Sequence, residues 1–298
     1  MPIRELFHFM QLVADHDTIH DAYDRLLAPK DWGPKHWSDF DKRWATLGCV
    51  GPDFVLEIME PSKDPADLGA PLPKFHHRHG DHLHSFSWYV DPDDMRPMIE
   101  RLSGMGVNVL TPYVERDPDA PVETFFTHPK STYGQLEFQS RPPSEGARDF
   151  HLRPDWTSDF WRDEFPLGLV RTSHLTLAVS DLEGAQDLYH KGFDAPSFHR
   201  EETHDRVSSY CLVGDTVVEI AQPKSEESWI GQDVAAHGNI PHAMTFAVAD
   251  LATAEKHAVA VGQAVAWRDD ETIYLDPAGL ANAVVGFTVR AIPGDPRG

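Results

Sequence analysis

The stretch LFHFMQLVADHDTIHDAY, residues 6–23, returns later in the chain as TSHLTLAVSDLEGAQDLY, residues 172–189. In both copies a histidine, His8 or His174, lies seven residues before an aspartate, Asp15 or Asp181. Each copy has the pattern of a strand followed by a helix. The repetition therefore predicts a duplicated unit, and it decides how the rest of the chain is interpreted.

Three further pairs of segments follow in the same order. FVLEIMEP (54–61) matches VVEIAQP (217–223), RPMIERLSGMGVNVL (96–110) matches ATAEKHAVAVGQAVAW (252–267), and FFTHPKSTYGQLEF (125–138) matches IYLDPAGLANAVVGF (273–287). The offset between copies shrinks from 166 residues at His8 and His174 to 148 at Pro129 and Pro277. The second copy is therefore the first with short deletions.

Each copy also divides into two βαβββ modules. One strand and helix, His8 to Leu27, precede strands that end at EIMEP, and a second strand (84–90) and helix (about 94–105) precede strands that end at LEFQ. We expect an α+β protein with domains at 1–140 and 167–298. Residues 141–166 form a proline-rich, charged linker, whose two tryptophans predict that it packs against the domains.

Composition narrows the range of partners and compartments. The net charge of -22 argues against nucleic acid and anionic membranes, and no apolar run approaches the length of a membrane span. Two cysteines in 298 residues make a disulfide framework improbable, and the N-terminus lacks the form of a signal peptide. We expect a cytoplasmic protein with a small-molecule substrate, and the two-fold plan makes a homodimer plausible.

These segments resemble the vicinal oxygen chelate (VOC) superfamily, which includes glyoxalase, methylmalonyl-CoA epimerase, extradiol dioxygenases and bleomycin-resistance proteins. The resemblance rests on the paired modules, the first-strand histidine, the FVLEIMEP strand and THPKSTYGQLEF (127–138), which is closest to the epimerases. It covers nearly all of the chain except the linker. It implies cupped mixed β-sheets with flanking helices, two modules to each sheet.

The resemblance also implies a metal centre in the first domain. Carried over by position, the ligands are His8, Glu57, His84 and Glu137, a set that suits one Fe, Mn, Co, Ni or Zn ion. Strand alternation puts Gln135, Glu137 and Gln139 on one face.

The same positions in the second copy do not make a complete site. His174 and Glu219 persist, but His84 maps onto Ala243 and Glu137 maps onto Val285. The second domain is therefore expected to be degenerate and to lack a metal.

The segment HHRHGDHLH, residues 76–84, holds five histidines. The alignment above pairs His84 with Ala243. An alignment that starts from Val90 and Val248 instead pairs His84 with His242 and turns Ser85, not His84, toward the inside. A β-bulge in this strand would reconcile the two alignments. His82 lies two residues before His84, on the same face of the expected strand, and is the alternative ligand. His76, His77 and His79 are interpreted as loop residues at the cavity rim.

Three reactions or functions fit this pattern. The first is an isomerase, epimerase or lyase that stabilises an enolate at the metal, with Glu57 or Glu137 as the base and with His128, Lys130 and Tyr133 in a short lid. The second is an Fe(II) extradiol-type dioxygenase with His8, His84 and Glu137 as its facial triad. The third is a metal-free binding or resistance protein, for which the acidic chain would suit a cationic ligand.

Overall fold

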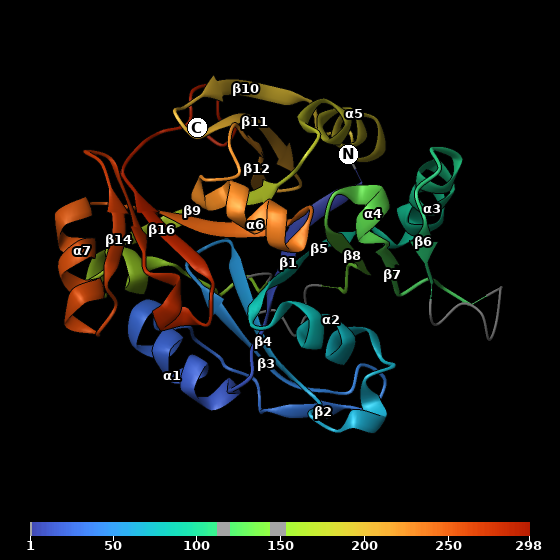
Figure 1. Ribbon diagram of the computed structural model, residues 1–298, viewed down its shortest axis with the longest axis horizontal. Helices are drawn as coiled ribbons and strands as arrows, with labels where there is room; N and C mark the ends of the chain where they lie inside the picture. Colours follow the sequence, from blue (N-terminus) through green and yellow to red (C-terminus); the bar gives the residue numbers. More distant parts are fainter. Residues whose placement is uncertain (1, 112–119, 144–152) are drawn as a thin grey trace.

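The computed structural model describes residues 2–111, 120–143 and 153–298. Two eight-stranded mixed sheets dominate it, one built from each half of the chain (Figure 1). Their strand orders are β2-β3-β4-β1-β5-β8-β7-β6 and β10-β11-β12-β9-β13-β16-β15-β14. The identical order confirms the duplication that the sequence predicts.

The strands of the first sheet match the predicted segments closely. They are β1 (Ile3–Leu12), β2 (His36–Ser38), β3 (Arg43–Val50), β4 (Phe54–Pro61), β5 (His82–Val90), β6 (Val109–Leu110), β7 (Thr124–Thr127) and β8 (Gln135–Ser140). Those of the second sheet are β9 (Leu169–Ala178), β10 (Ser197–Glu202), β11 (Arg206–Val213), β12 (Thr216–Pro223), β13 (Ile240–Val248), β14 (Val265–Arg268), β15 (Thr272–Leu275) and β16 (Val284–Thr288).

Each module carries one main helix, as predicted. These are α1 (His16–Leu27), α3 (Met95–Gly104), α5 (Leu182–Phe193) and α7 (Leu251–Ala260). Asp15 and Asp181 cap α1 and α5, because each side chain accepts a hydrogen bond from a backbone N–H three residues on. The two aspartates of the repeat thus start the helices.

Two helices of nine residues each were not predicted. They are α2 (Pro71–His79) and α6 (Trp229–His237), which occupy equivalent places before β5 and β13. His76, His77 and His79 therefore lie on a helix, and their interpretation as loop residues was wrong. Pro71 and Pro73 near the start of α2 made the segment resemble a loop, although proline is well tolerated in the first turn of a helix.

The pairing of β1 with β5 contains a bulge. Met10 pairs with Ser85 and Gln11 pairs with Leu83, so His84 is the extra residue. β9 and β13 repeat this arrangement with His242 as the extra residue between Pro241 and Ala243. The structure therefore pairs His84 with His242 across the repeat, and a bulge is present in each sheet.

The two halves share one continuous hydrophobic core, which contains buried side chains of both sheets. Their hairpin tips also exchange contacts. Asp53 Oδ1, between β3 and β4, accepts a hydrogen bond from Thr172 N–H at 2.8 Å, and Asp215 Oδ1, between β11 and β12, accepts one from Leu6 N–H at 2.9 Å. Each half thus holds the first strand of the other.

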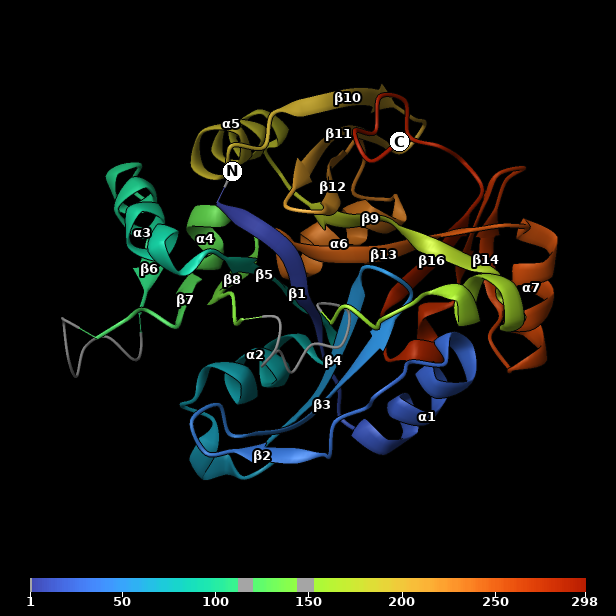
Figure 2. The ribbon, with the colours of Figure 1, turned by 180° about the vertical axis from the view of Figure 1, so that it is seen from behind.

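The linker packs against the first half where the structure describes it, and residues 144–152 lie outside the described part. Trp156 donates its indole N–H to the Gly51 carbonyl, and the fully buried Trp161 donates to the Leu27 carbonyl. Figure 2 shows this segment crossing the back of the molecule toward β9. The prediction that the tryptophans pack is confirmed. No helix among the described residues is long and apolar enough to cross a membrane.

Candidate metal centre

Three neighbouring strands bring His8, Ser87 and Glu137 side by side in the first sheet. His8 on β1 pairs with Ser87 on β5, and Ser87 pairs with Glu137 on β8. Strand alternation turns Gln135, Glu137 and Gln139 toward a cavity, while Leu136 and Phe138 join the core. This confirms the predicted polar face of β8.

The imidazole of His8 lies between two carboxylates. Its Nε2 is 3.2 Å from Glu137 Oε2, and its Nδ1 is 3.4 Å from Glu57 Oε2. All three side chains are buried, with His8 exposed by 5% and Glu57 by 1%. Two ligands with metal bonds of about 2.1 Å that meet at a right angle are about 3.0 Å apart, close to the 3.2 Å observed between His8 Nε2 and Glu137 Oε2. The His8–Glu137 pair therefore fits a metal ion.

Glu57 has a second partner, which the sequence reasoning missed. Arg43 Nη2 lies 3.1 Å from Glu57 Oε1. The second sheet repeats the arrangement, with Arg206 Nε 2.9 Å from Glu219 Oε1 and His174 Nε2 3.6 Å from Glu219 Oε2. The signal was present in the sequence, because an arginine starts both RWATLGCV (43–50) and RVSSYCLV (206–213).

His84 lies apart from these groups. Its Nδ1 is 2.7 Å from Ser85 Oγ, and its ring packs edge-on against Phe75. Burial lowers the pKa of His84 to about 3, so the ring is neutral, as a metal ligand must be. Its side chain lines the same cavity as His8 and Glu137. The structure thus brings together three of the four predicted ligands and leaves His84 at the bulge.

We call the hollow side of the first sheet, which carries His8 and Glu137, the first cup, and the corresponding side of the second sheet the second cup. The second cup is filled at the place where the first cup is open. Gly286 pairs with Thr245, which pairs with His174, so Gly286 is the structural equivalent of Glu137. The sequence alignment pointed to Val285 because the loop before β16 is one residue longer than its counterpart. A Cβ at Gly286 would lie 2.6 Å from the Tyr274 ring. The tyrosine ring therefore covers the place that corresponds to the Glu137 side chain.

Glu219 is also surrounded more fully than Glu57. Its oxygens accept hydrogen bonds from Thr176 and Ser208, at 2.7 and 2.6 Å, in addition to the arginine contact. Burial opposes its ionisation, but Arg206 and these donors outweigh burial and hold the pKa of Glu219 well below its usual range. The second cup is thus a closed ion-pair network, in a cavity of about 540 Å³ against about 2600 Å³ in the first.

Comparison with solved structures shows the same architecture in full. A 4-hydroxymandelate synthase variant from Streptomyces coelicolor aligns over 98% of this chain and 94% of its own, with a TM-score of 0.68 and 16% sequence identity. The chain has the vicinal oxygen chelate fold.

Two shorter proteins each align with less than half of the chain. Methylmalonyl-CoA epimerase from Mycobacterium tuberculosis covers 42% of this chain and 90% of its own, at 17% identity and a TM-score of 0.39. A variant of the Streptomyces coelicolor epimerase covers 43% of this chain and 99% of its own, at 20% identity and a TM-score of 0.39. No protein-family model and no curated protein matches the sequence.

The predicted lid is a single helical turn, α4 (Pro129–Thr132). His128 caps the turn by accepting a hydrogen bond from Lys130 N–H, and both residues line the first cavity. Tyr133 turns away from it, because its hydroxyl donates to Asp181 Oδ2 of the second half at 3.2 Å. Of the three predicted lid residues, two face the cavity.

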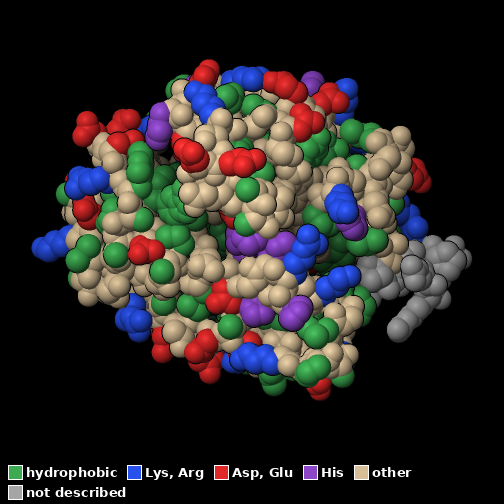
Figure 3. All heavy atoms as spheres, in the orientation of Figure 1, with side chains coloured by type: hydrophobic (Ala, Val, Ile, Leu, Met, Phe, Trp, Pro, Cys, Tyr) green, Lys and Arg blue, Asp and Glu red, His purple; other side chains and the backbone are tan. Residues whose placement is uncertain are grey.

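Cationic side chains gather at the mouth of the first cavity, although the chain as a whole is acidic. Lys74 and Arg78 on α2 and Lys130 on α4 line it, and none of them has an ion-pair partner within the described ranges. Figure 3 shows Lys, Arg and His side chains around a hollow bordered by α2, α4 and α6. This rim favours an anionic molecule, in contrast to the cationic ligand that net charge suggested.

Proposed function

We propose that this chain is a divalent-metal-dependent enzyme, of the isomerase, epimerase or lyase type, that acts on a small, oxygen-rich anion in the first cup. The observation that carries the proposal is the His8 ring between Glu57 and Glu137 at the floor of the larger cavity. A divalent ion held there would act as a Lewis acid on adjacent substrate oxygens and stabilise an enolate.

His8 and Glu137 would hold the ion, and Glu57 would orient His8. A carboxylate on the far nitrogen of a ligating histidine fixes its tautomer and ring position, and Glu57 Oε2, 3.4 Å from His8 Nδ1, is placed to take that role. Ser87 Oγ is buried between His8 and Glu137 and makes no hydrogen bond to any described residue. It is therefore placed to contact the ion or a substrate oxygen.

Glu137 is the better placed of the two carboxylates to move a proton. Both oxygens of Glu57 face cationic or imidazole groups, Arg43 and His8. Glu137 Oε1 has no hydrogen bond or ion pair with the described residues, and the side chain borders the cavity. An unengaged carboxylate oxygen beside a bound carbonyl compound can accept a proton from the adjacent carbon.

The cationic rim would select the substrate. Lys74, Arg78 and Lys130 would attract a carboxylate or phosphate and leave the uncharged reacting carbon nearer to Glu137. Neutral analogues of the same carbonyl compounds should therefore bind more weakly.

Deuterium exchange tests the proposal even when the product of the reaction is unknown. The protein is loaded in turn with Fe(II), Mn, Co, Ni and Zn and incubated in D2O with a panel of small 2-oxo, 2-hydroxy and 1,3-dicarbonyl acids. We expect NMR to show exchange of a carbon-bound proton next to a carbonyl. Exchange should be lost in Glu137→Gln and kept in Glu219→Gln, a control in the second cup at the position that corresponds to Glu57. Exchange that is equal in Glu137→Gln and the parent protein would contradict the role of Glu137.

A dioxygenase is the second candidate, because His84 lines the same cavity as His8 and Glu137. A ring-cleaving enzyme would need all three as Fe(II) ligands, so His84 would have to leave Ser85 and turn inward. Oxygen uptake with Fe(II) and catechols, abolished by His84→Ala, would favour this function over the enolate chemistry.

A further inference from the structure

A group of histidines and one aspartate lies where the two halves of the chain meet, apart from the His8–Glu137 pair. We call it the interdomain histidine cluster; its members are His79, His82, Asp233, His237 and His242. The first two come from the end of α2 and the start of β5, and the others come from α6 and β13. Because α2 and α6 are repeat equivalents, their final histidines meet across the pseudo-two-fold relation of the halves.

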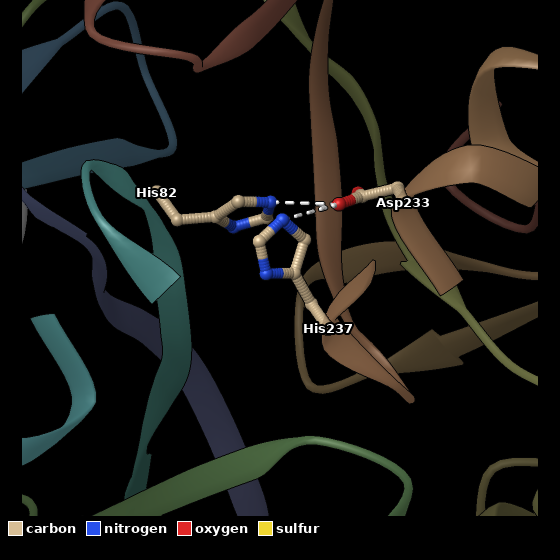
Figure 4. A group of neighbouring side chains, drawn as sticks. All are labelled: His82, Asp233 and His237. Carbon is tan, nitrogen blue, oxygen red and sulfur yellow. Dashed lines mark hydrogen bonds and ion pairs between the residues drawn. The ribbon is translucent and has the colours of Figure 1, made fainter. Parts of the chain in front are cut away.

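Three donors of this cluster converge on one point. His82 Nε2 is 2.8 Å from Asp233 Oδ1, and His237 Nε2 is 3.7 Å from the same oxygen. One ligand atom from each of the three residues lies within 4.8 Å of the others. In the part of the chain that the structure describes, no other set of three metal-ligating side chains is so compact. Figure 4 shows both rings directed at the carboxylate.

The hydrogen bonds of His82 require a positive charge at this point. Its Nδ1 is 2.7 Å from the Leu83 carbonyl, which can only accept, so Nδ1 carries a proton. In a neutral ring Nε2 then presents a lone pair to the Asp233 carboxylate, which is unfavourable. Either a second proton or a metal cation must lie between them.

Partners outside the three donors hold them in place. Asp233 Oδ2 accepts a hydrogen bond from His242 Nδ1 at 2.6 Å, and His237 Nδ1 is 3.0 Å from His79 Nδ1. With His79 as the acceptor, His237 directs the lone pair of its Nε2 at the same point as His82. In protein metal sites, the polar atoms of a ligand that do not bind the metal are usually held by hydrogen bonds to neighbouring groups.

We infer that His82, Asp233 and His237 form a second metal site, which binds a divalent ion of the zinc type and joins the two halves of the chain. Two imidazoles and one carboxylate suit Zn²⁺ or Co²⁺. Ligands at about 2.1 Å from a tetrahedral ion are about 3.4 Å apart, and the observed 2.8 and 3.7 Å lie on either side of that value.

The position of the site links it to the first cup. His79 and His237 both line the mouth of the first cavity. An ion held there would fix α6 of the second half against β5 of the first, beside the cavity. The ion would therefore stabilise the interface and add positive charge to the rim.

Metal stoichiometry of the full-length protein tests the inference. Protein stripped with a chelator is titrated with Zn²⁺ and Co²⁺, and bound metal is counted after equilibrium dialysis. We expect two equivalents in the parent protein and loss of one in His237→Gln, with affinity at that site weakened at least about 100-fold. Glu137→Gln should lose the other equivalent, which separates this site from the one in the proposed function.

Two further measurements keep the test decisive. His77→Gln, an exposed position on α2 outside the cluster, is the matched control and should bind like the parent. Visible bands of tetrahedral Co²⁺ should persist in Glu137→Gln and vanish in His237→Gln; if the latter does not fold, Asp233→Asn replaces it. Unchanged stoichiometry and affinity in a folded cluster variant, or no metal beyond the one lost in Glu137→Gln, would overturn the inference.

Discussion

The two cups of this chain contain the same histidine, glutamate and arginine, yet they surround the glutamate differently. In the second cup Thr176 and Ser208 donate to Glu219, and the Tyr210 hydroxyl lies 3.2 Å from Glu219 Oε1. Their counterparts around Glu57 are Met10, Ala45 and Leu47, which cannot donate a side-chain hydrogen bond.

The difference distinguishes the residues that both sheets share from those found only in the first cup. The His–Glu–Arg group persists in both cups, so it serves the sheet whether or not a metal binds. Glu137 and the apolar surroundings of Glu57 occur only in the first cup, which leaves carboxylate oxygens available there. A carboxylate saturated with donors, such as Glu219, has little left to offer a ligand.

The largest expected effect comes from exchanging the two equivalent histidines for glutamine. His8→Gln should weaken metal binding in the first cup at least about 1,000-fold, because it removes one of two protein ligands. His174→Gln should leave metal binding unchanged, since burial lowers the pKa of His174 to about 4 and its ring belongs to the closed network. Equilibrium dialysis with Zn²⁺ measures both, and equal losses in the two variants would break the comparison.

The second effect concerns the exchanged hairpin tips. Burial, together with the nearby Asp53, raises the pKa of Asp215 from 3.8 to about 7. Between pH 3.8 and about 7 the folded protein therefore keeps a proton on Asp215 that the unfolded chain has released. The free energy of unfolding that this proton contributes near pH 4 is lost as the pH rises to 7. The loss can reach about 4 kcal/mol at 1.36 kcal/mol per unit.

Asp215→Asn keeps the acceptor for Leu6 N–H and should remove this loss. Urea unfolding at pH 5, 6, 7 and 8 should show a smaller decline of the unfolding free energy in the variant than in the parent protein. Asp187→Asn, an exposed residue on α5, should leave the parent decline unchanged. Parallel curves for the parent and Asp215→Asn would show that this carboxyl is ionised throughout.

The smallest effect concerns the filled position of the second cup. Gly286→Ala should cost about 1 to 3 kcal/mol of unfolding free energy, because the new methyl group meets the Tyr274 ring at 2.6 Å and Thr245 Oγ1 at 3.1 Å. Thermal and urea unfolding measure it. Gly69→Ala, where no atom lies within 4 Å of the added Cβ, is the control and should be nearly neutral. A neutral Gly286→Ala would mean that the tyrosine moves aside easily.

The fold was predictable because the chain contains two copies of one unit, which can be aligned with each other. The spacing from His8 to Asp15 recurs from His174 to Asp181, and both aspartates cap helices in the structure. The gradual loss of residues between copies showed that the second copy is the first with short deletions. Strand alternation then placed Glu137 on the cavity face, since side chains on a strand alternate strictly.

The parts that escaped prediction depend on register and on contacts between distant residues. A one-residue longer loop moved the counterpart of Glu137 from Val285 to Gly286, whereas the bulge at His84 is among the alternatives that the sequence indicates. The meeting of His82 with Asp233 depends on how two helices approach each other across the halves. No local pattern specifies such an approach.

The exchanged hairpin tips join the two halves of the single chain much as an interface joins the subunits of a dimer. Cutting the chain in the linker would deprive Leu6 and Thr172 of the carboxylates that accept their N–H groups, and would expose a core that both halves share. The covalent connection supplies a high effective concentration of one half near the other. The two cups can therefore differ in their side chains while the halves stay joined.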